Sequence, residues 1–212
     1  MRIRSIVGLI PLFAVQVLEP RVYRSLPGLR DRIHWFLKHR PDLSRLVSRW
    51  NISGQGNRVL LSLLHGHHMK ALLKRMFDET EFLSDHGVRA LSRVHLDNPF
   101  VFYHNSESFS IQYLPGESNS RVFGGNSNWR GPVWMPVNFL LIESIRELHR
   151  YYGDDFRVEY PTGSGQKFSL TQIADELARR VTTLFLLDGN GERPVMTAYP
   201  QLQVNPLFGT VS

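Results

Sequence analysis

Eleven consecutive residues, Gly124 to Trp134, bring together the side chains best suited to hold a sugar. The stretch reads GGNSNWRGPVW, with two tryptophans, one arginine, two asparagines and three glycines. Tryptophan faces stack on the apolar C–H face of a pyranose, and arginine offers a fixed fork of donors to hydroxyls or to a carboxylate. Glycines let the backbone approach a ligand closely. Composition alone supports two interpretations equally: a sugar site, or a tight connection whose tryptophans anchor it in a core.

The sequence matches neither the phosphate-loop motif nor the motif of a serine nucleophile. The segment from Pro161 to Lys167 lies between a predicted strand and a predicted helix, where a phosphate loop would be. However, Gln166 separates Gly165 from Lys167, which breaks the phosphate-loop spacing. The sequence also contains no Gly-x-Ser-x-Gly elbow for a serine nucleophile. We therefore interpret this segment as a turn before a capped helix, and a nucleotide site is not expected.

The histidines and carboxylates do not form a convincing catalytic set either. His65, His67 and His68 invite a metal hypothesis, but a catalytic zinc site usually needs an ordered second shell, and polar histidines at a helix start are the better interpretation. Glu117 is the one carboxylate in the polar approach to the tryptophan-rich stretch, and a surface loop residue is the alternative. Glycoside hydrolysis needs two carboxyl groups about 5 to 10 Å apart, and no such pair can be nominated. Six other acidic residues fit solvated helix faces or caps: Asp78, Glu79, Glu81, Glu143, Glu147 and Asp175.

Composition describes a soluble globular chain without metal-thiolate or disulfide chemistry. The 212 residues include no cysteine, and 25 basic against 19 acidic residues give a net charge of +6. The basic residues are scattered, so we expect no nucleic-acid partner. The apolar run from Ile6 to Leu18 is too short to span a bilayer and lacks a cleavage site. We predict a buried, kinked helix there, no membrane partner and a cytoplasmic location.

Hydrophobic periodicity predicts a mainly helical chain that positions the tryptophan-rich stretch at the entrance to a helix. That helix runs from Val137 to Tyr152, or from Pro136, and Trp134 and Asn138 lie one turn apart at its start. Asn138, Leu141, Ile145 and Leu148 share one face. Further predicted elements are a helix from Leu29 to Arg40, a strand from Val59 to Leu64, a helix from Met69 to Phe77, a β-hairpin over Val101–Tyr103 and Phe109–Tyr113, a strand from Phe156 to Tyr160, and a helix that begins with the capping box Ser169–Gln172.

The tryptophan-rich stretch closely resembles glycoside hydrolase family 63, which includes processing α-glucosidases and mannosylglycerate-hydrolase-like enzymes. The resemblance continues through PVNFLLIES, residues 136–144. It extends to four further segments: residues 2–12 (RIRSIVGLIPL), 86–92 (HGVRALS), 151–156 (YYGDDF) and 161–165 (PTGSG). It thus covers almost the whole chain.

This resemblance implies part of an (α/α)6 barrel with a short β-hairpin insertion, an inverting mechanism, and no metal or organic cofactor. Members of the family are several times longer, so we expect residues 1–212 to be a partial catalytic domain, truncated at both ends. The general acid would come from before Met1 and the general base from beyond Ser212, so no catalytic residue is assigned. The residues implied to bind substrate are Trp129, Arg130 and Trp134, together with Asn126, Asn128 and Asn138.

The expected function is therefore that of a fragment of an inverting glycoside hydrolase acting on α-glucosidic or related O-glycosidic bonds. We expect it to grip an oligosaccharide or glycoside but to be inactive alone, with the missing portions of the same barrel as its partner. The alternative is a non-catalytic carbohydrate-binding or scaffold remnant. Missing barrel helices would leave apolar faces uncovered, so aggregation of the isolated chain is expected.

Overall fold

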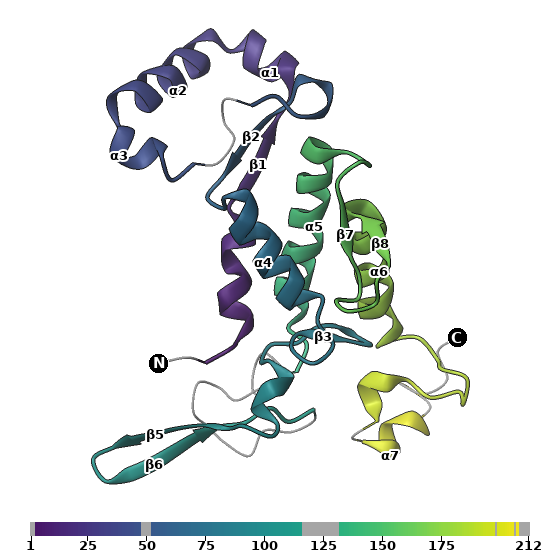
Figure 1. Ribbon diagram of the computed structural model, residues 1–212. Coiled ribbons are helices and arrows are strands. Elements are labelled where there is room, and N and C mark those ends of the chain that lie inside the picture. The colour runs from purple at the N-terminus through teal and green to yellow at the C-terminus, as the bar shows by residue number, and fades with distance from the viewer. Residues whose placement is uncertain (1–2, 48–51, 116–131, 198, 206, 208–212) are drawn as a thin grey trace. The chain divides into compact units, whose positions relative to one another are not determined.

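The computed structural model describes residues 3–47, 52–115, 132–197, 199–205 and 207. Over these ranges the chain is mainly helical, with four two-stranded antiparallel sheets (Figure 1). The prediction of a mainly α chain is confirmed. The chain divides into two compact units. The first comprises Met1–Ile6, Glu79–Phe139 and Asp175–Ser212, and the second comprises Val7–Asp78 and Leu140–Ala174.

The first part of the second unit is a run of helices between two paired strands. Strand β1 (Val15–Leu18) pairs antiparallel with β2 (Val59–Ser62). Strand β2 confirms the strand that was predicted from Val59 to Leu64. Three α-helices follow β1, and each begins at a proline, whose missing N–H costs nothing in the first turn. These helices and one short 3₁₀ helix are α1 (Pro20–Ser25), α2 (Pro27–His39), α3 (Pro41–Ser44) and η2 (Gln55–Asn57).

The apolar run at residues 6–18 is where the predicted single helix is wrong. It forms a 3₁₀ helix η1 (Ile6–Phe13) followed by strand β1. The buried residues Ile6, Leu9 and Leu12 recur every third position, which suits the three residues per turn of a 3₁₀ helix. The strand exists because Val59–Ser62 supplies its hydrogen-bonding partner, and local periodicity cannot reveal a partner so far away in the sequence.

Helices α4 (Gly66–Met76) and α5 (Met135–Tyr152) bury the faces that the sequence predicted. On α4 the buried residues are Met69, Leu73 and Met76, so its methionines serve as core side chains. On α5 the predicted face, with Asn138 and Leu141 among its members, is buried. The helix begins at Met135, two residues before the predicted Val137 and one before the alternative start at Pro136.

Strands β7 (Arg157–Glu159) and β8 (Lys167–Ser169) form a hairpin that leads into helix α6 (Leu170–Thr183). The capping box at the start of α6 is confirmed. The Gln172 N–H donates to Ser169 Oγ at 3.4 Å, and the Ser169 N–H donates to Gln172 Oε1 at 2.9 Å. Strand β8 was not predicted, because three residues are too few to show an alternating pattern.

An ion-pair cluster ties separate parts of the second unit together. Glu19 Oε1 lies 2.9 Å from Arg58 Nε and 2.6 Å from Arg150 Nη2, near the end of α5. The guanidinium of Arg58, with that of Arg150, holds the pKa of Glu19 below its usual value. Arg150 also pairs with Glu147 one turn earlier on the helix.

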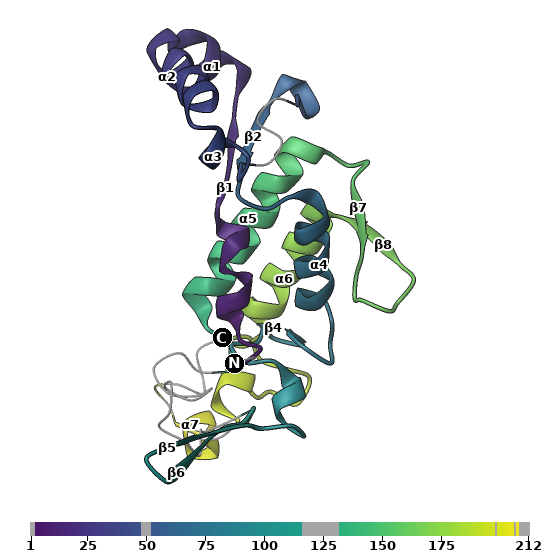
Figure 2. The same ribbon diagram turned by 60° about the vertical axis from the view of Figure 1, so that its left-hand side comes forward.

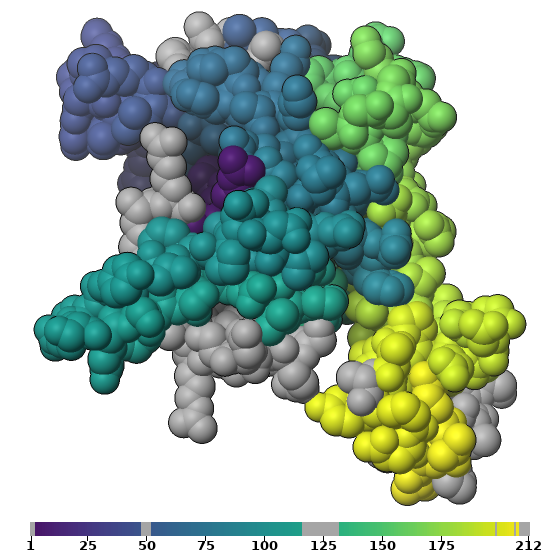
Figure 3. Space-filling view, turned by 60° about the horizontal axis from the view of Figure 1, so that its bottom comes forward, coloured from purple at the N-terminus to yellow at the C-terminus, as the bar shows by residue number. Residues whose placement is uncertain are grey.

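The first unit contains the predicted β-hairpin, which is confirmed. Strands β5 (Phe100–His104) and β6 (Glu107–Ile111) pair in antiparallel register, with Phe102 opposite Phe109 and ring centroids 5.2 Å apart. The two turn residues Asn105 and Ser106 both have positive φ, as a tight hairpin turn requires. The strands lie side by side in both ribbon views (Figure 1; Figure 2), and their side chains are drawn in teal in the space-filling view (Figure 3).

The first unit also contains a small apolar core and several short elements. Leu91, Ile111 and Tyr113 form this core, and partly buried apolar residues pack against it. No helix in the described ranges is both long enough and apolar enough to cross a membrane. The short elements are β3 (Leu83–Ser84), β4 (Gly87–Val88), η3 (Arg93–His95), η5 (Pro194–Met196) and α7 (Pro200–Gln203).

Candidate functional site

The described part of the tryptophan-rich stretch is its carboxyl end, Pro132 to Trp134, together with the first turn of α5. Of the six residues predicted to bind substrate, Trp134 and Asn138 fall within the described ranges. The other four, and Glu117, lie outside the described residues: Asn126, Asn128, Trp129 and Arg130. Their contact with a sugar stays a prediction.

Asn138 fixes the start of α5 to strand β4. Its Oδ1 accepts a hydrogen bond from the Val88 N–H at 2.7 Å, and its Nδ2 donates to the Val88 carbonyl at 3.0 Å. Nδ2 also donates to the carbonyl of Trp134 at 3.1 Å, and that carbonyl accepts the Asn138 N–H as well. The side chain therefore pairs with Val88 as a neighbouring strand would, while it holds the Trp134 backbone. With Asn138 only 1% exposed, this geometry favours a positioning role over direct contact with a ligand.

Gly87 lets Asn138 approach the strand this closely. Its φ of +111° lies in the region that favours glycine. A Cβ at this position would lie 2.8 Å from Asn138 Oδ1 and 2.7 Å from Val181 Cγ2. Both distances are shorter than van der Waals contact, so a side chain there would displace the amide that holds Trp134.

Arg89 holds the other anchor of the stretch. Its backbone forms a β-bridge with Val133, and the next residue donates a hydrogen bond from the Ala90 N–H to the Pro132 carbonyl at 2.8 Å. The buried guanidinium donates from Nη1 to the carbonyls of Leu83 and Glu79. Nε donates to the Tyr113 hydroxyl at 3.2 Å, and the guanidinium carbon lies 5.7 Å from the centroid of that ring.

The charge of Arg89 is thus compensated by neutral acceptors, because the described residues provide it with no ion pair. A buried cation needs such hydrogen bonds to offset its lost hydration. Removing it would free the carbonyls that define the turn before β4. The signal for this role was present in the sequence, since Arg89 stands inside the apolar run Val88 to Leu91.

One acidic residue differs from its prediction. Glu81 was expected on a solvated helix face or cap, but it is 9% exposed and lies in the turns after α4. Its carboxylate pairs with Arg4 at 3.0 Å, and its backbone carbonyl accepts the Arg93 N–H. The prediction failed because helix α4 ends at Met76, so Glu81 lies in the turns beyond it. The Glu81 carboxylate is buried and its partner Arg4 is about half exposed, and this pairing indicates a structural role.

The glycine-rich segment between β7 and β8 binds a carboxylate of its own hairpin. Glu159 Oε1 accepts the Gly165 N–H at 2.7 Å. The backbone N–H groups of Gly165 and then Gly163 hold the pKa of Glu159 below its usual value. Donors that would face a phosphate in a phosphate loop therefore face a side chain of the protein.

At the start of α4 the His67 ring is nearly parallel to that of His65 and tilted by 47° against that of His68. Ring centroids of His67 and His68 lie 4.0 Å apart, and those of His65 and His67 lie 6.4 Å apart. Within the described ranges, no group of three or more histidine, aspartate or glutamate side chains is arranged to hold a metal ion.

A yeast protein of greater length is similar to most of this chain. The chain is 46% identical over 194 residues to a Saccharomyces cerevisiae protein named "Uncharacterized protein YMR196W". That match covers 91% of this chain but 18% of the yeast protein, so the chain spans less than a fifth of this relative's length. No family model matches the chain. No solved structure matches it either.

Proposed function

We propose that this chain is a section of an inverting glycoside hydrolase that resembles family 63, with the stretch from Gly124 to Trp134 lining a sugar subsite. The observation that carries the proposal is the buried support beneath the end of that stretch. The carbonyls of Pro132 and Trp134 are each held by hydrogen bonds, from Ala90 and from Asn138. A loop end that is fixed before the ligand arrives loses less conformational entropy on binding.

The proposed fold is part of an (α/α)6 barrel. Helix α5 supports this, because it carries apolar residues outside its buried face. Phe139 is 62% exposed and Leu140 is 45% exposed. A helix that is apolar on more than one side suits an element packed between neighbours on both sides. In this proposal the neighbouring helices belong to other parts of a longer protein. The yeast relative is such a longer protein, because its match to this chain covers only 18% of it.

The proposed contribution of this chain is to grip the sugar rather than to cleave the bond. Inverting hydrolysis needs one carboxylic acid to protonate the leaving oxygen and one carboxylate to activate water. We assign neither role to a described residue. Trp134 would supply an apolar face for a pyranose, and Arg89, Gly87 and Asn138 would hold its backbone in place.

Two measurements on the 212-residue chain test this proposal. Isothermal titration with maltose should show saturable binding. Replacing Trp134 with alanine should weaken that binding by roughly 2- to 12-fold, because an aromatic contact is worth about 0.5–1.5 kcal/mol. Trp35→Ala is the matched control, since Trp35 is an exposed tryptophan of α2 in the second unit. The control should bind maltose as the parent chain does.

Hydrolysis of 4-nitrophenyl α-D-glucoside separates gripping from cleavage. We expect no turnover above background. Turnover that Glu117→Gln abolishes would contradict our assignment of the catalytic pair to other parts of the enzyme. Absent maltose binding, or binding that Trp134→Ala leaves unchanged, would contradict the subsite itself. The full-length yeast relative can be assayed in the same way. If this chain binds maltose but the yeast relative does not hydrolyse α-glucosides, the alternative function, a non-catalytic carbohydrate-binding remnant, is favoured over the enzyme.

A further inference from the structure

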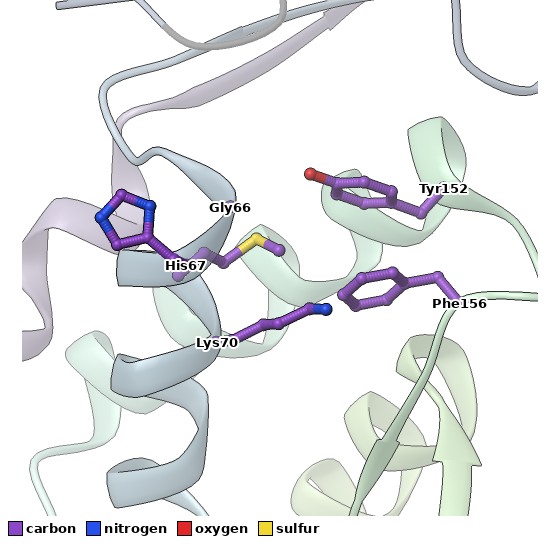
Figure 4. A pocket seen from close by; sticks show the side chains of 6 residues that line it. Gly66, His67, Lys70, Tyr152 and Phe156 are labelled. Atoms are coloured by element: carbon purple, nitrogen blue, oxygen red, sulfur yellow. The ribbon is translucent and has the colours of Figure 1, made fainter.

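A pocket within the second unit lies between the start of α4 and the end of α5. Its volume is about 580 Å³, within the range of roughly 300–1,000 Å³ that holds small ligands. Gly66, His67, Met69 and Lys70 line it from α4, and Tyr152 and Phe156 line it from the opposite side (Figure 4). None of these residues belongs to the tryptophan-rich stretch.

One wall of the pocket is a stacked aromatic pair. The rings of Tyr152 and Phe156 have centroids 4.4 Å apart and an interplanar angle of 26°. The chain reverses between them at Gly153, whose φ is +73° and whose N–H donates to the His149 carbonyl at 2.7 Å. A Cβ on Gly153 would lie 2.9 Å from Gln55 Oε1. The turn that brings the two rings together is therefore built into the end of α5.

A cation faces this wall. The Nζ atom of Lys70 lies 5.8 Å from the centroid of the Phe156 ring, and Figure 4 shows the side chain reaching across the pocket toward it. The described residues form no ion pair with Lys70. Asp154, two residues before Phe156, lies 3.9 Å from His149 Nε2. Helix α4 (GHHMKALLKRM) contains no acidic residue, so no carboxylate of its own helix offsets the charge of the amine.

A ring-shaped ligand with an anionic group fits these features better than a neutral or cationic one. The aromatic wall offers a flat apolar face for a sugar or a base. The ammonium group of lysine acts as a point charge for phosphate. The Tyr152 hydroxyl points toward the start of α4 in Figure 4, which places a polar group at the rim of the wall.

We propose that this pocket binds a small phosphomonoester of a ring compound, with the ring on the Phe156–Tyr152 wall and the phosphate at Lys70. The source is a sugar phosphate or a nucleoside monophosphate. This site is separate from the proposed maltose subsite and does not rest on it. Loss of maltose binding in a Trp134 variant leaves the pocket's test unaffected.

The test is titration of the 212-residue chain with four probes: glucose 6-phosphate, AMP, glucose and inorganic phosphate. We expect at least one of the two phosphomonoesters to bind about tenfold more tightly than inorganic phosphate and glucose. The probe that binds identifies the source. Equal binding of inorganic phosphate and both phosphomonoesters, or no binding of any probe, overturns the proposal.

Variants locate the binding at this pocket. Lys70→Gln should weaken binding of the phosphomonoester by about tenfold or more, as expected for a hydrogen bond to a charged group, while Lys70→Arg should retain most of it. Lys38 is an exposed lysine of α2, so Lys38→Gln removes the same charge at another place. This control should not change the affinity for the phosphomonoester. Phe156→Leu should weaken ring-dependent binding by roughly 2- to 10-fold without changing the affinity for inorganic phosphate. Equal affinities in Lys70→Gln and Lys38→Gln would overturn the proposal, and circular dichroism checks that each variant folds.

Discussion

Replacing Asn138 with alanine removes the side chain that pairs with both backbone groups of Val88. The Val88 N–H donates to Oδ1 at 2.7 Å and its carbonyl accepts from Nδ2 at 3.0 Å, in a site where Val88 is 1% exposed. The Trp134 carbonyl keeps the backbone N–H of residue 138 as a partner. The substitution therefore leaves two buried polar groups without their partner.

Each buried polar group that loses its partner costs roughly 1–3 kcal/mol. Two such groups give roughly 2–6 kcal/mol, and water that enters the space of the lost amide reduces the upper part of this range. We expect Asn138→Ala to lower the free energy of unfolding by about 2–4 kcal/mol. Urea unfolding followed by circular dichroism at 222 nm measures the change.

The matched control is Asn98→Ala in the same unit, an exposed residue before Pro99. Surface substitutions of this kind usually change stability by about 0.5 kcal/mol or less. If the free energy of unfolding of Asn138→Ala also lies within about 0.5 kcal/mol of that of the parent chain, the hydrogen bonds to Val88 do not hold this region together. The support that we assign to the tryptophan-rich stretch would then be refuted.

Three further predictions concern stability. Gly87→Ala should lower the free energy of unfolding by about 1–3 kcal/mol, because of its positive φ and the clash described above. Gly28→Ala, where nothing lies within 4 Å of the added Cβ, should be neutral or slightly stabilising, and equal losses for the two would contradict the clash. Arg179 holds the pKa of Glu176 at about 2, below the ordinary 4.5, so this stabilisation is present above pH 4.5 and lost as the pH falls toward 2. Melting temperatures of Glu176→Gln should therefore fall less between pH 5 and pH 2 than those of the parent, and parallel curves would contradict the pairing. Ser169→Ala should cost about 1 kcal/mol in urea unfolding through loss of the N-cap, and an unchanged midpoint would show that the cap contributes nothing.

Local pattern was sufficient for the longer helices α2, α4, α5 and α6 and for the hairpin, but not for the short helices α1, α3 and α7. Helix α5 and its buried face follow from apolar residues at helical spacing, and the capping box at Ser169 follows from two residues three apart. The hairpin of β5 and β6 follows from aromatic runs on either side of turn residues. In each case the residues that decide the structure are close together in the sequence.

Non-local partners account for what the sequence did not predict. Strand β1 depends on β2, more than forty residues later, whereas the local apolar pattern of its segment predicts a helix. Likewise, the role of Asn138 depends on Val88, fifty residues earlier, and nothing in its local sequence distinguishes a ligand contact from a backbone anchor. Arg89 is a different case: its place inside an apolar run is a local signal of burial, but its acceptors on Glu79, Leu83 and Tyr113 are not evident from that run.

The central claim is that the tryptophan-rich stretch holds a sugar, and indole NMR tests it most directly. The chain contains four tryptophans: Trp35, Trp50, Trp129 and Trp134. Their indole N–H signals can be assigned one by one with tryptophan-to-phenylalanine variants, and then followed while maltose is added. We predict saturable shifts of the Trp129 and Trp134 signals and a stationary Trp35 signal. Signals of Trp129 and Trp134 that stay fixed up to saturating maltose would contradict the claim.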